Sequence, residues 1–406
     1  MKIATAFSLA VNTQDAIAEL VATLQQALPA APQVLLLYFT EQHDVAQLLA
    51  CVRRAFPASQ IMGCSSCQGI MTEAGYHSAQ GWALAAWALC DEFGAYGSAG
   101  VACSGQDGAS NESMAIAAVD LAMARSRRPG ELPALVWLHA SPGIEESVIR
   151  GIQHRLGGSV PIVGGSAADN SAAGRWHLLT QDGALTSGVA VTLFYPNCQI
   201  ACAFHSAYMP AERHGLVTKA QGRELLEIDG VAAADVYNEW TQGAIAHARD
   251  GESIMDQTTL FPLAREVGVL AGVPYYKLSH PESVTARRGL RLFTEIQEGE
   301  EVILMQGNEA DLLSRAVRSS DLTPRDHRAL TLSHAIGALN IFCAGCMLAI
   351  GPAMGQVVES LRDGLGGIPF IAPFTFGEQG RFTGGENAHG NLMISTVCFY
   401  QLRVQE

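Results

Sequence analysis

The sequence predicts an α/β protein made of two mixed α/β modules in which buried strands alternate with helices. Short continuous apolar runs such as 34–39 are typical of strands that are buried on both faces. Between these runs, stretches such as 44–56 carry apolar residues at helical spacing. A third observation is the glycine content, 41 of 406 residues, which provides many tight turns. In open α/β sheets, ligands usually bind at the carboxyl ends of the strands.

In the first half of the chain, most strands are followed by a helix. The expected strands are 3–9, 33–39, 60–62, 82–89, 97–103, 135–139 and 160–163. The expected helices are 15–28, 44–56, 113–125 and 144–156. Pro29 ends the first helix. Small-residue loops at 63–69 and 164–166 follow two of the strands, so we expect a ligand-binding edge there.

The pattern changes near residue 180, where successive strands follow one another. Strands are expected at 184–194, 199–204, 302–306, 339–350, 369–376 and 392–402. Helices are expected at 232–240, 309–318 and 355–364. The segment 209–215 is a plausible crossing into a second module. We therefore place the modules at 1–208 and 209–406.

Composition argues against several classes of partner. Acidic residues outnumber basic ones by 39 to 25, which gives a net charge of −14 and leaves too few cations for a nucleic-acid surface. No uninterrupted apolar run approaches the roughly 18 residues that a membrane span needs. The ten cysteines lie mostly in apolar contexts, which is typical of buried thiols in a reducing compartment. We expect a cytoplasmic protein with neither a nucleic-acid nor a membrane partner.

Five motifs occur in an order that resembles the FIST sensory-domain family. They are 63–66 (GCSS), 164–169 (GGSAAD), 228–233 (IDGVAA) with Tyr237 and Trp240, 342–346 (FCAGC), and 376–378 (FGE) with Asn391. The resemblance covers nearly the whole chain, with a FIST N-like first module and a FIST C-like second module. It implies a ligand-sensing protein that passes its state to a separate signalling partner, and it implies no reaction.

Two departures from the family pattern narrow the expected ligand. Gly69 stands where we expect an acidic residue, and Cys346 stands where we expect arginine. Losing these charges makes the pocket less polar. The segments 376–380 and 389–393 resemble the haem-binding, nitric-oxide-sensing branch of the family. That resemblance implies haem b as cofactor, nitric oxide or another diatomic gas as ligand, and a histidine kinase or cyclic-di-GMP enzyme as partner. A homodimer is a further hypothesis.

Twelve histidines are available to supply the axial nitrogen that haem iron needs. We rank His389 first, because it lies in a Gly/Asn-rich turn before the final apolar strand, and His280 second, because two tyrosines lie just before it. His139 would end a strand at the ligand-binding edge. The alternatives are a hydrogen-bonded turn histidine at 389, a strand-end residue before proline at 280, and a core or capping histidine at 139. His205 and His247 rank lower.

Two Cys-x-x-Cys pairs, Cys64 with Cys67 and Cys343 with Cys346, offer four thiols. Together they could bind zinc or an iron–sulfur cluster, act as redox pairs, or fill the core as small apolar residues. The second pair lies within the expected strand 339–350, where its thiols would point to opposite faces. We therefore favour buried thiols, with Cys346 as a minor candidate for a haem thiolate ligand.

Three polar residues near the end of the chain suit ligand binding. Glu378 and Asn391 could orient a ligand, and Arg381 could pair with a haem propionate; the alternative is that all three are solvated loop residues. If the three converge on a small polar pocket, a FIST module for an amino acid or similar metabolite is favoured instead. A third hypothesis is a thiol-dependent enzyme that uses Cys64 or Cys346. Our expectation is a sensor without enzymatic activity.

Overall fold

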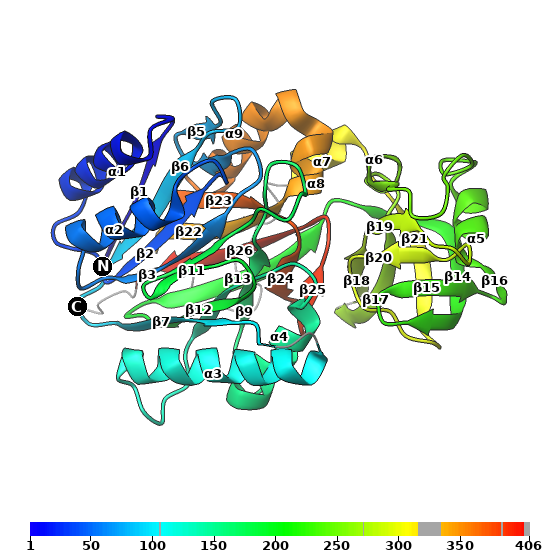
Figure 1. Ribbon diagram of the computed structural model, residues 1–406, viewed down its shortest axis with the longest axis horizontal. Coiled ribbons are helices and arrows are strands. Elements are labelled where there is room, and N and C mark those ends of the chain that lie inside the picture. Colours follow the sequence, from blue (N-terminus) through cyan, green and yellow to red (C-terminus); the bar gives the residue numbers. More distant parts are fainter. Residues whose placement is uncertain (105–106, 271, 316–333, 383–384, 402–406) are drawn as a thin grey trace.

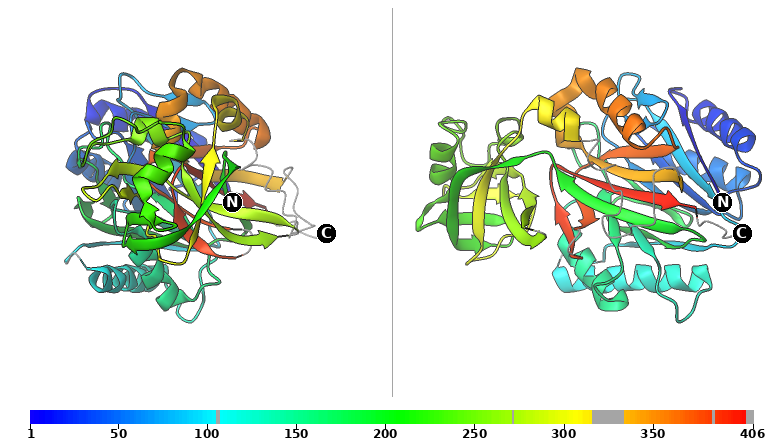
Figure 2. Two further views of the ribbon diagram at one scale, coloured as in Figure 1. Left: turned by 90° about the vertical axis from the view of Figure 1, so that its right-hand side faces the viewer. Right: turned by 180° about the vertical axis from the view of Figure 1, so that it is seen from behind.

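The computed structural model describes residues 1–104, 107–270, 272–315, 334–382 and 385–401. It has mixed α/β content, so the predicted fold class is confirmed. These described residues form a large main body, drawn from 1–208 and 309–401, and a smaller β-lobe, drawn from 209–306, that projects from one end (Figures 1 and 2).

The described residues of the main body form three six-stranded sheets, and the first shows the pattern that all three share. In spatial order its strands are β1 (Lys2–Ser8), β6 (Leu84–Cys90), β2 (Val34–Phe39), β3 (Gln60–Ser65), β10 (Leu178–Thr180) and β11 (Gly183–Leu185). The third and fourth strands, β2 and β3, are parallel. The last two form an antiparallel hairpin.

The second and third sheets repeat this order. The second runs β7 (Ala95–Ala102), β12 (Gly188–Tyr195), β8 (Leu135–Ala140), β9 (Ile162–Ser166), β24 (Glu378–Arg381) and β25 (Asn387–Gly390). The third runs β13 (Gln199–Ser206), β26 (Met393–Tyr400), β22 (Ala335–Cys343), β23 (Phe370–Thr375), β4 (Ile70–Thr72) and β5 (Gly75–His77). Their parallel pairs are β8 with β9 and β22 with β23.

Each terminal hairpin belongs in sequence to a different sheet from the one it joins. The hairpin β4–β5 follows β3 of the first sheet but pairs with β23 of the third. Likewise, β10–β11 follows β9 of the second sheet but pairs with β3, and β24–β25 follows β23 but pairs with β9. Strands from both sides of residue 208 therefore share the same sheets. The module boundary at 208 and 209 itself stays a prediction.

The three sheets face a common apolar centre. Trp87, Phe194 and Phe399 come from β6, β12 and β26, the second strand of each sheet. Their ring centroids lie 5.3 Å (Trp87–Phe399), 6.0 Å (Phe194–Phe399) and 6.5 Å (Trp87–Phe194) apart. All three are buried. This aromatic group ties the three sheets into one core.

Helices cover the outer face of each sheet (Figure 1). The first sheet carries α1 (Thr13–Ala27) and α2 (Val45–Ala55), the second α3 (Gly108–Ser126) and α4 (Glu145–Leu156), and the third α7 (Glu309–Arg315), α8 (Ala344–Ile350), η3 (Gly351–Ala353) and α9 (Met354–Gly364). Side chains of Asn12, Asp44 and Asp107 accept hydrogen bonds from the first turns of α1, α2 and α3.

One helical stretch has the length and composition of a membrane-crossing helix. Within Ala344–Gly364, an 18-residue window has a mean hydropathy of 1.2, and 50% of that window is buried inside the protein. The stretch is divided into α8, η3 and α9, and its apolar side chains belong to the core cluster that includes β22 and β23. Helices in the core of a folded protein often meet the same criteria of length and composition, so this stretch is weak evidence for a membrane span.

The β-lobe has its own sheet and its own core. Its elements are β14 (Met209–Gln221), β15 (Glu224–Ile228), β16 (Val231–Ala232), α5 (Ala233–Trp240), α6 (Met255–Thr258), β17 (Leu263–Leu270), β18 (Val273–Ser279), β19 (Pro281–Val284), β20 (Leu290–Leu292) and β21 (Glu301–Gln306). Val217, Tyr237 and Leu304 lie in this core. The lobe meets the main body where β18 lies against β25.

One sequence-based assignment is wrong in the second half. The expected strand 339–350 ends at Cys343, and Ala344–Ile350 forms α8, because a short apolar run does not distinguish a buried strand from a buried helix. Cys346 therefore lies on a helix. The segment 209–215, predicted as the crossing into a second module, is the beginning of β14, and the crossing itself stays a prediction. Residues 316–318 of the expected helix 309–318 lie outside the described residues.

Candidate functional site

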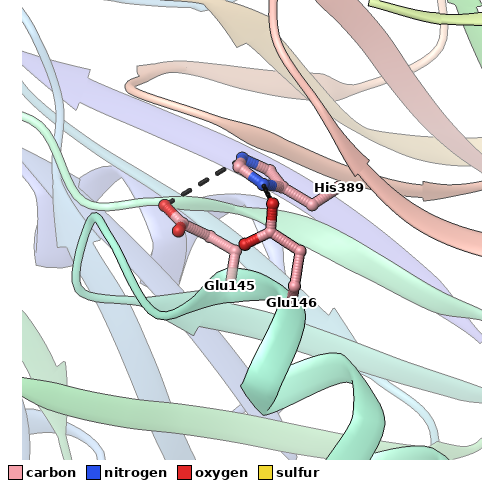
Figure 3. Close-up of side chains that lie close together, drawn as sticks. All are labelled: Glu145, Glu146 and His389. Carbon is pink, nitrogen blue, oxygen red and sulfur yellow. Dashed lines mark hydrogen bonds and ion pairs between the residues drawn. The ribbon is translucent and has the colours of Figure 1, made fainter. Parts of the chain in front are cut away.

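A buried charged cluster lies at the junction between the main body and the β-lobe. Glu145 and Glu146 form the first turn of α4, and His389 lies on β25 (Figure 3). Arg223 comes from the turn between β14 and β15 of the lobe. Acidic side chains in the first turn suit the positive end of a helix dipole, which explains why two adjacent glutamates are tolerated here.

The imidazole of His389 lies between the two carboxylates (Figure 3). Its Nδ1 is 3.1 Å from Oε1 of Glu146, and its Nε2 is 4.0 Å from Oε1 of Glu145. The side chains of His389 and Glu145 are only 1% and 2% exposed. In the part of the chain that the structure describes, these three residues form a set whose donor atoms all lie within 4.8 Å of one another.

Arg223 binds the outer oxygens of the same carboxylates. Its Nη2 lies 2.6 Å from Oε2 of Glu145 and 2.5 Å from Oε2 of Glu146. The two Oε1 atoms are thereby left on the side of His389. Ser166 Oγ donates a hydrogen bond to Oε1 of Glu145 at 2.6 Å, and the Glu295 amide donates to Oε1 of Glu146 at 2.8 Å.

Electrostatics hold both glutamates in the charged form. Burial raises the pKa of Glu145, but the positive charge of Arg223 and the proximity of His389 outweigh it and lower that pKa. For Glu146, burial is likewise outweighed by His389 and then Arg223, so its pKa lies well below the ordinary value. Burial lowers the pKa of Arg223, yet the two carboxylates raise it overall. Glu145, Glu146 and Arg223 therefore form a buried network of full charges.

Two buried polar atoms beside this network have no hydrogen-bond partner among the residues that the structure describes. They are Nε2 of His389 and Oε1 of Gln379. Gln379 lies opposite His389 in the β24–β25 pair, and its amide nitrogen donates to Ser166 Oγ at 3.3 Å. Residue 377 beside Nε2 is glycine, and a Cβ there would lie 2.5 Å from Nε2. Unpaired buried polar atoms are uncommon and point to a missing ligand or water.

The structure does not bring the other predicted histidines to this cluster. Nε2 of His280 lies 3.2 Å from the Met255 carbonyl, and His139 contacts the Tyr38 hydroxyl at 3.0 Å and the Gly165 carbonyl at 2.8 Å. Burial lowers the pKa of both histidines to about 4. They are neutral core residues. His205 is half-buried, and His247 is exposed.

The predicted polar residues also lie apart. Glu378 is fully buried, where it accepts hydrogen bonds from the Met393 amide and the Thr375 hydroxyl, and burial raises its pKa well above the ordinary value. Arg381 donates to the Gly158 carbonyl at 2.8 Å, whereas Asn391 accepts from the His280 amide at 3.3 Å. The described contacts therefore do not bring the three to one polar pocket.

The cysteines form no common ligand set among the described residues. Cys64 lies in the central core cluster, whereas Cys67, Cys343 and Cys346 lie in the cluster around α8 and α9. Sγ of Cys346 lies 3.8 Å from the Tyr208 hydroxyl. Burial raises the pKa of Cys67 to about 12, which favours an inert thiol.

The sequence pattern ranks His389 first among the histidines but gives no indication of its partners. Glu145 and Glu146 begin a predicted helix, and Arg223 lies in a polar turn, so each has an ordinary local explanation. The only sequence signal is two adjacent acidic residues in a first helical turn, which is common. The interaction depends on chain segments that lie far apart in sequence.

Comparisons with known proteins give matches over most of the chain. A family model described as the FIST N domain matches residues 33–231, and one described as the FIST C domain matches residues 233–381. A search of curated proteins gives no match.

Two solved structures show a weak likeness. One is cyanuric acid hydrolase from A. caulinodans, with 9% identity, coverage of 98% of this chain and 99% of that chain, and a TM-score of 0.35. The other is described as "Cyanuric acid hydrolase: evolutionary innovation by structural concatenation", with the same identity and coverage and a TM-score of 0.36. At these scores the likeness supports no functional conclusion.

Proposed function

The chain belongs to the FIST family, and from this premise we propose that it is a sensor whose responsive element is the charged junction between the β-lobe and the main body. FIST domains are sensory domains of signal transduction. The proposed ligand is small and polar, and the proposed output is a change in how the lobe sits on the main body.

The observation that carries this proposal is the position of Arg223. It belongs to the lobe, yet its side chain is only 19% exposed and binds two carboxylates of the main body. Breaking a buried ion pair leaves an uncompensated charge, which costs about 3–5 kcal/mol. A ligand that competes for either partner therefore has a large differential effect on the two arrangements, as a sensor requires.

The rest of the junction has both apolar and polar contacts. Leu278 of the lobe packs in the core cluster that contains Phe342 and Met393 of the main body. The Asn391 amide donates to the Leu278 carbonyl at 3.2 Å, and Arg150 pairs with Glu295 at 3.0 Å. These contacts let the lobe stay attached while the charged cluster responds. The proposed listener is a separate signalling protein, a histidine kinase or a cyclic-di-GMP enzyme.

Haem and nitric oxide remain the finer hypothesis from the sequence, but the surroundings of His389 do not fit haem. Its Nε2 faces a carboxylate at 4.0 Å, and a single Cβ on Gly377 would fill the space beside it. A porphyrin needs a wide, mostly apolar cavity at the axial nitrogen. A surface hollow in the lobe, lined by Lys219 and Arg287, has about 110 Å³, below the roughly 300 Å³ of a small ligand pocket. The proposed response therefore involves no haem.

An absorption spectrum tests the haem hypothesis directly. Protein from haem-supplemented cells would be compared with His389→Ala and His280→Ala variants in the ferric, ferrous and nitrosyl states. A stoichiometric haem spectrum that either substitution alters would replace the polar-ligand proposal.

Hydrogen exchange measured by mass spectrometry tests the junction. The amides of His280, Glu295 and Asn391 report on it, because each donates across the contact between lobe and main body. We expect faster exchange at these amides in Arg223→Met and no change in Arg288→Met, whose ion pair with Asp235 lies within the lobe. In the wild type, one member of a panel of amino acids and related polar metabolites should change exchange at the same amides. Equal exchange in Arg223→Met and wild type would contradict the proposal.

A further inference from the structure

We propose that His389 and Glu145 bind a divalent transition-metal ion through Nε2 and Oε1, with Glu146 orienting the imidazole. The charged cluster is thus assigned a ligand chemistry, a mixed nitrogen and oxygen site of the kind that Zn²⁺ occupies. The proposal that a metal binds here does not depend on the proposed sensory function. Only its consequence for the β-lobe rests on the proposed function.

The arrangement of the imidazole is the first support. Oε1 of Glu146 lies 3.1 Å from Nδ1 and is placed to accept its proton, which leaves the Nε2 lone pair facing Glu145. In metal sites, histidine ligands usually donate their other ring nitrogen to a carboxylate in this way. The carboxylate fixes the tautomer and makes the coordinating nitrogen more basic. Glu146 therefore acts as a positioning residue.

The unpartnered atom is the second and independent support. Nε2 of His389 is buried and has no hydrogen-bond partner in the described part of the chain, and the whole side chain is 1% exposed. Its neighbour across the gap is Oε1 of Glu145 at 4.0 Å. Two ligands of a tetrahedral Zn²⁺ ion lie about 3.4 Å apart when each bond is about 2.1 Å. An approach of about half an ångström, within the freedom of a glutamate side chain, would therefore bring both atoms to a shared ion.

Gly377 leaves the room for the ion. A Cβ at this position would lie 2.5 Å from Nε2 of His389 and 3.5 Å from Oε1 of Glu145, so it would occupy the space between the two donors. Gln379 adds a second acceptor without a partner, Oε1, and its amide contacts the hydroxyl of Ser166 that binds Glu145. Unsatisfied acceptors at a buried position are costly unless a cation or water occupies the site.

The net charge of the cluster and its exposure to solvent also suit a bound cation. The guanidinium of Arg223 contacts the Oε2 atoms of Glu145 and Glu146, whereas their Oε1 atoms face His389. A metal ion and the guanidinium therefore need not compete for the same oxygen. Two carboxylates and one guanidinium leave one negative charge in excess. The side chains of Glu146 and Arg223 are 17% and 19% exposed, which places the cluster next to solvent.

The metal would weaken the attachment of the lobe. A dication on Oε1 draws charge from the Glu145 carboxylate and repels the guanidinium of Arg223 across the same group. The ion pair between lobe and main body is then less favourable. If the proposed function holds, the metal ion is the small polar ligand that shifts the arrangement.

The test is Zn²⁺ binding by the metal-free full chain, measured by equilibrium dialysis and by X-ray absorption at the zinc edge. We expect wild type to bind one Zn²⁺ more than Gly377→Ala and His389→Gln, with only nitrogen and oxygen ligands at that ion. Glu146→Gln should weaken this site about 10- to 100-fold. Gly355→Ala is the matched control, because a Cβ there meets nothing within 4 Å. Mg²⁺ should not compete, since it disfavours imidazole.

The outcomes separate the site from the sensor. Gly377→Ala keeps every ligand and charged side chain, so it remains informative if His389→Gln does not fold. Equal Zn²⁺ stoichiometry and affinity in wild type and folded Gly377→Ala, or sulfur ligands only, would overturn the metal site and leave the charged junction intact. Zn²⁺ binding without any change in exchange at Glu295 and Asn391 would retain the site and refute its role in moving the lobe.

Discussion

Nδ1 of His389 lies 3.1 Å from Oε1 of Glu146, which joins two residues that are 243 positions apart in the sequence. The contact connects the start of α4 with β25, at the place where Arg223 enters from the β-lobe. A single imidazole thus touches a network that links the main body and the lobe. The stability of this junction should depend on each charged member.

Removing Arg223 should destabilise the protein through the carboxylates it leaves behind. We expect Arg223→Met to lower the free energy of unfolding by about 3–5 kcal/mol, because Glu145 and Glu146 would remain buried without their cation. In a urea-denaturation double-mutant cycle with Glu145→Gln, the coupling should exceed about 1 kcal/mol. The exposed pair Arg288–Asp235 is the control and should show about 0–1 kcal/mol. Additive effects at Arg223 and Glu145 would argue against a shared buried network.

Glu378→Gln should make the protein more stable at neutral and alkaline pH. Burial raises the folded-state pKa of Glu378 well above 4.5, so its contribution to stability is fully present below pH 4.5 and is lost as pH rises. Each pH unit above 4.5 costs about 1.4 kcal/mol while the folded carboxyl stays protonated. The advantage of the variant should therefore grow as pH rises from 5 to 7. Urea denaturation at both pH values measures it, and Glu359→Gln on the exposed face of α9 should show no such trend.

His139 should make the protein sensitive to mild acid. Burial lowers its folded-state pKa from 6.5 to about 4, so the unfolded chain takes up a proton first as pH falls. Stability present above pH 6.5 should therefore be lost progressively towards pH 4, by about 3 kcal/mol from this residue. His139→Gln should be less stable at pH 7.5 but lose less on acidification, as followed by denaturation at pH 7.5 and 5. If the exposed His154→Gln control gave the same flattening, His139 would not be the cause.

Phe399→Ala should weaken the contact between all three sheets. Its ring lies 5.3 Å from Trp87 and 6.0 Å from Phe194, so truncation leaves a cavity at the common centre. A cost of about 3–5 kcal/mol is expected. Phe93→Ala is the control, since Phe93 is 73% exposed and should change stability by less than about 0.5 kcal/mol. Calorimetry should show one cooperative transition at lower temperature; separate transitions for the sheets would contradict a shared core.

Much of the local structure follows from the sequence. The apolar run at 34–39 forms β2, and the helical spacing at 44–56 forms α2, Val45–Ala55. These predictions succeed because side-chain periodicity reports directly on which face of an element is buried. The assignment of 339–350 as one strand failed where α8 begins, because a fully buried helix and a fully buried strand have the same apolar composition.

Only part of the candidate site could be predicted from the sequence. His389 was ranked first among the histidines, yet its neighbours are carboxylates from α4. Glu378, Asn391 and Arg381, whose convergence on one pocket would favour the metabolite-binding alternative, make separate contacts. Proximity in sequence places Glu378 and His389 on neighbouring strands, but the strand registers decide which side chains meet.

The sequence by itself determined the α/β class, the alternation of buried strands and amphipathic helices, and the FIST resemblance, since each depends on residues that are close together in the chain. Only the tertiary structure decided that three hairpins are exchanged among three similar sheets. It also decided that Arg223, Glu145, Glu146 and His389 meet. The physical reason is that long-range packing determines which strands pair and which buried charges neutralise one another. Local periodicity does not predict which distant segment completes a sheet or neutralises a charge.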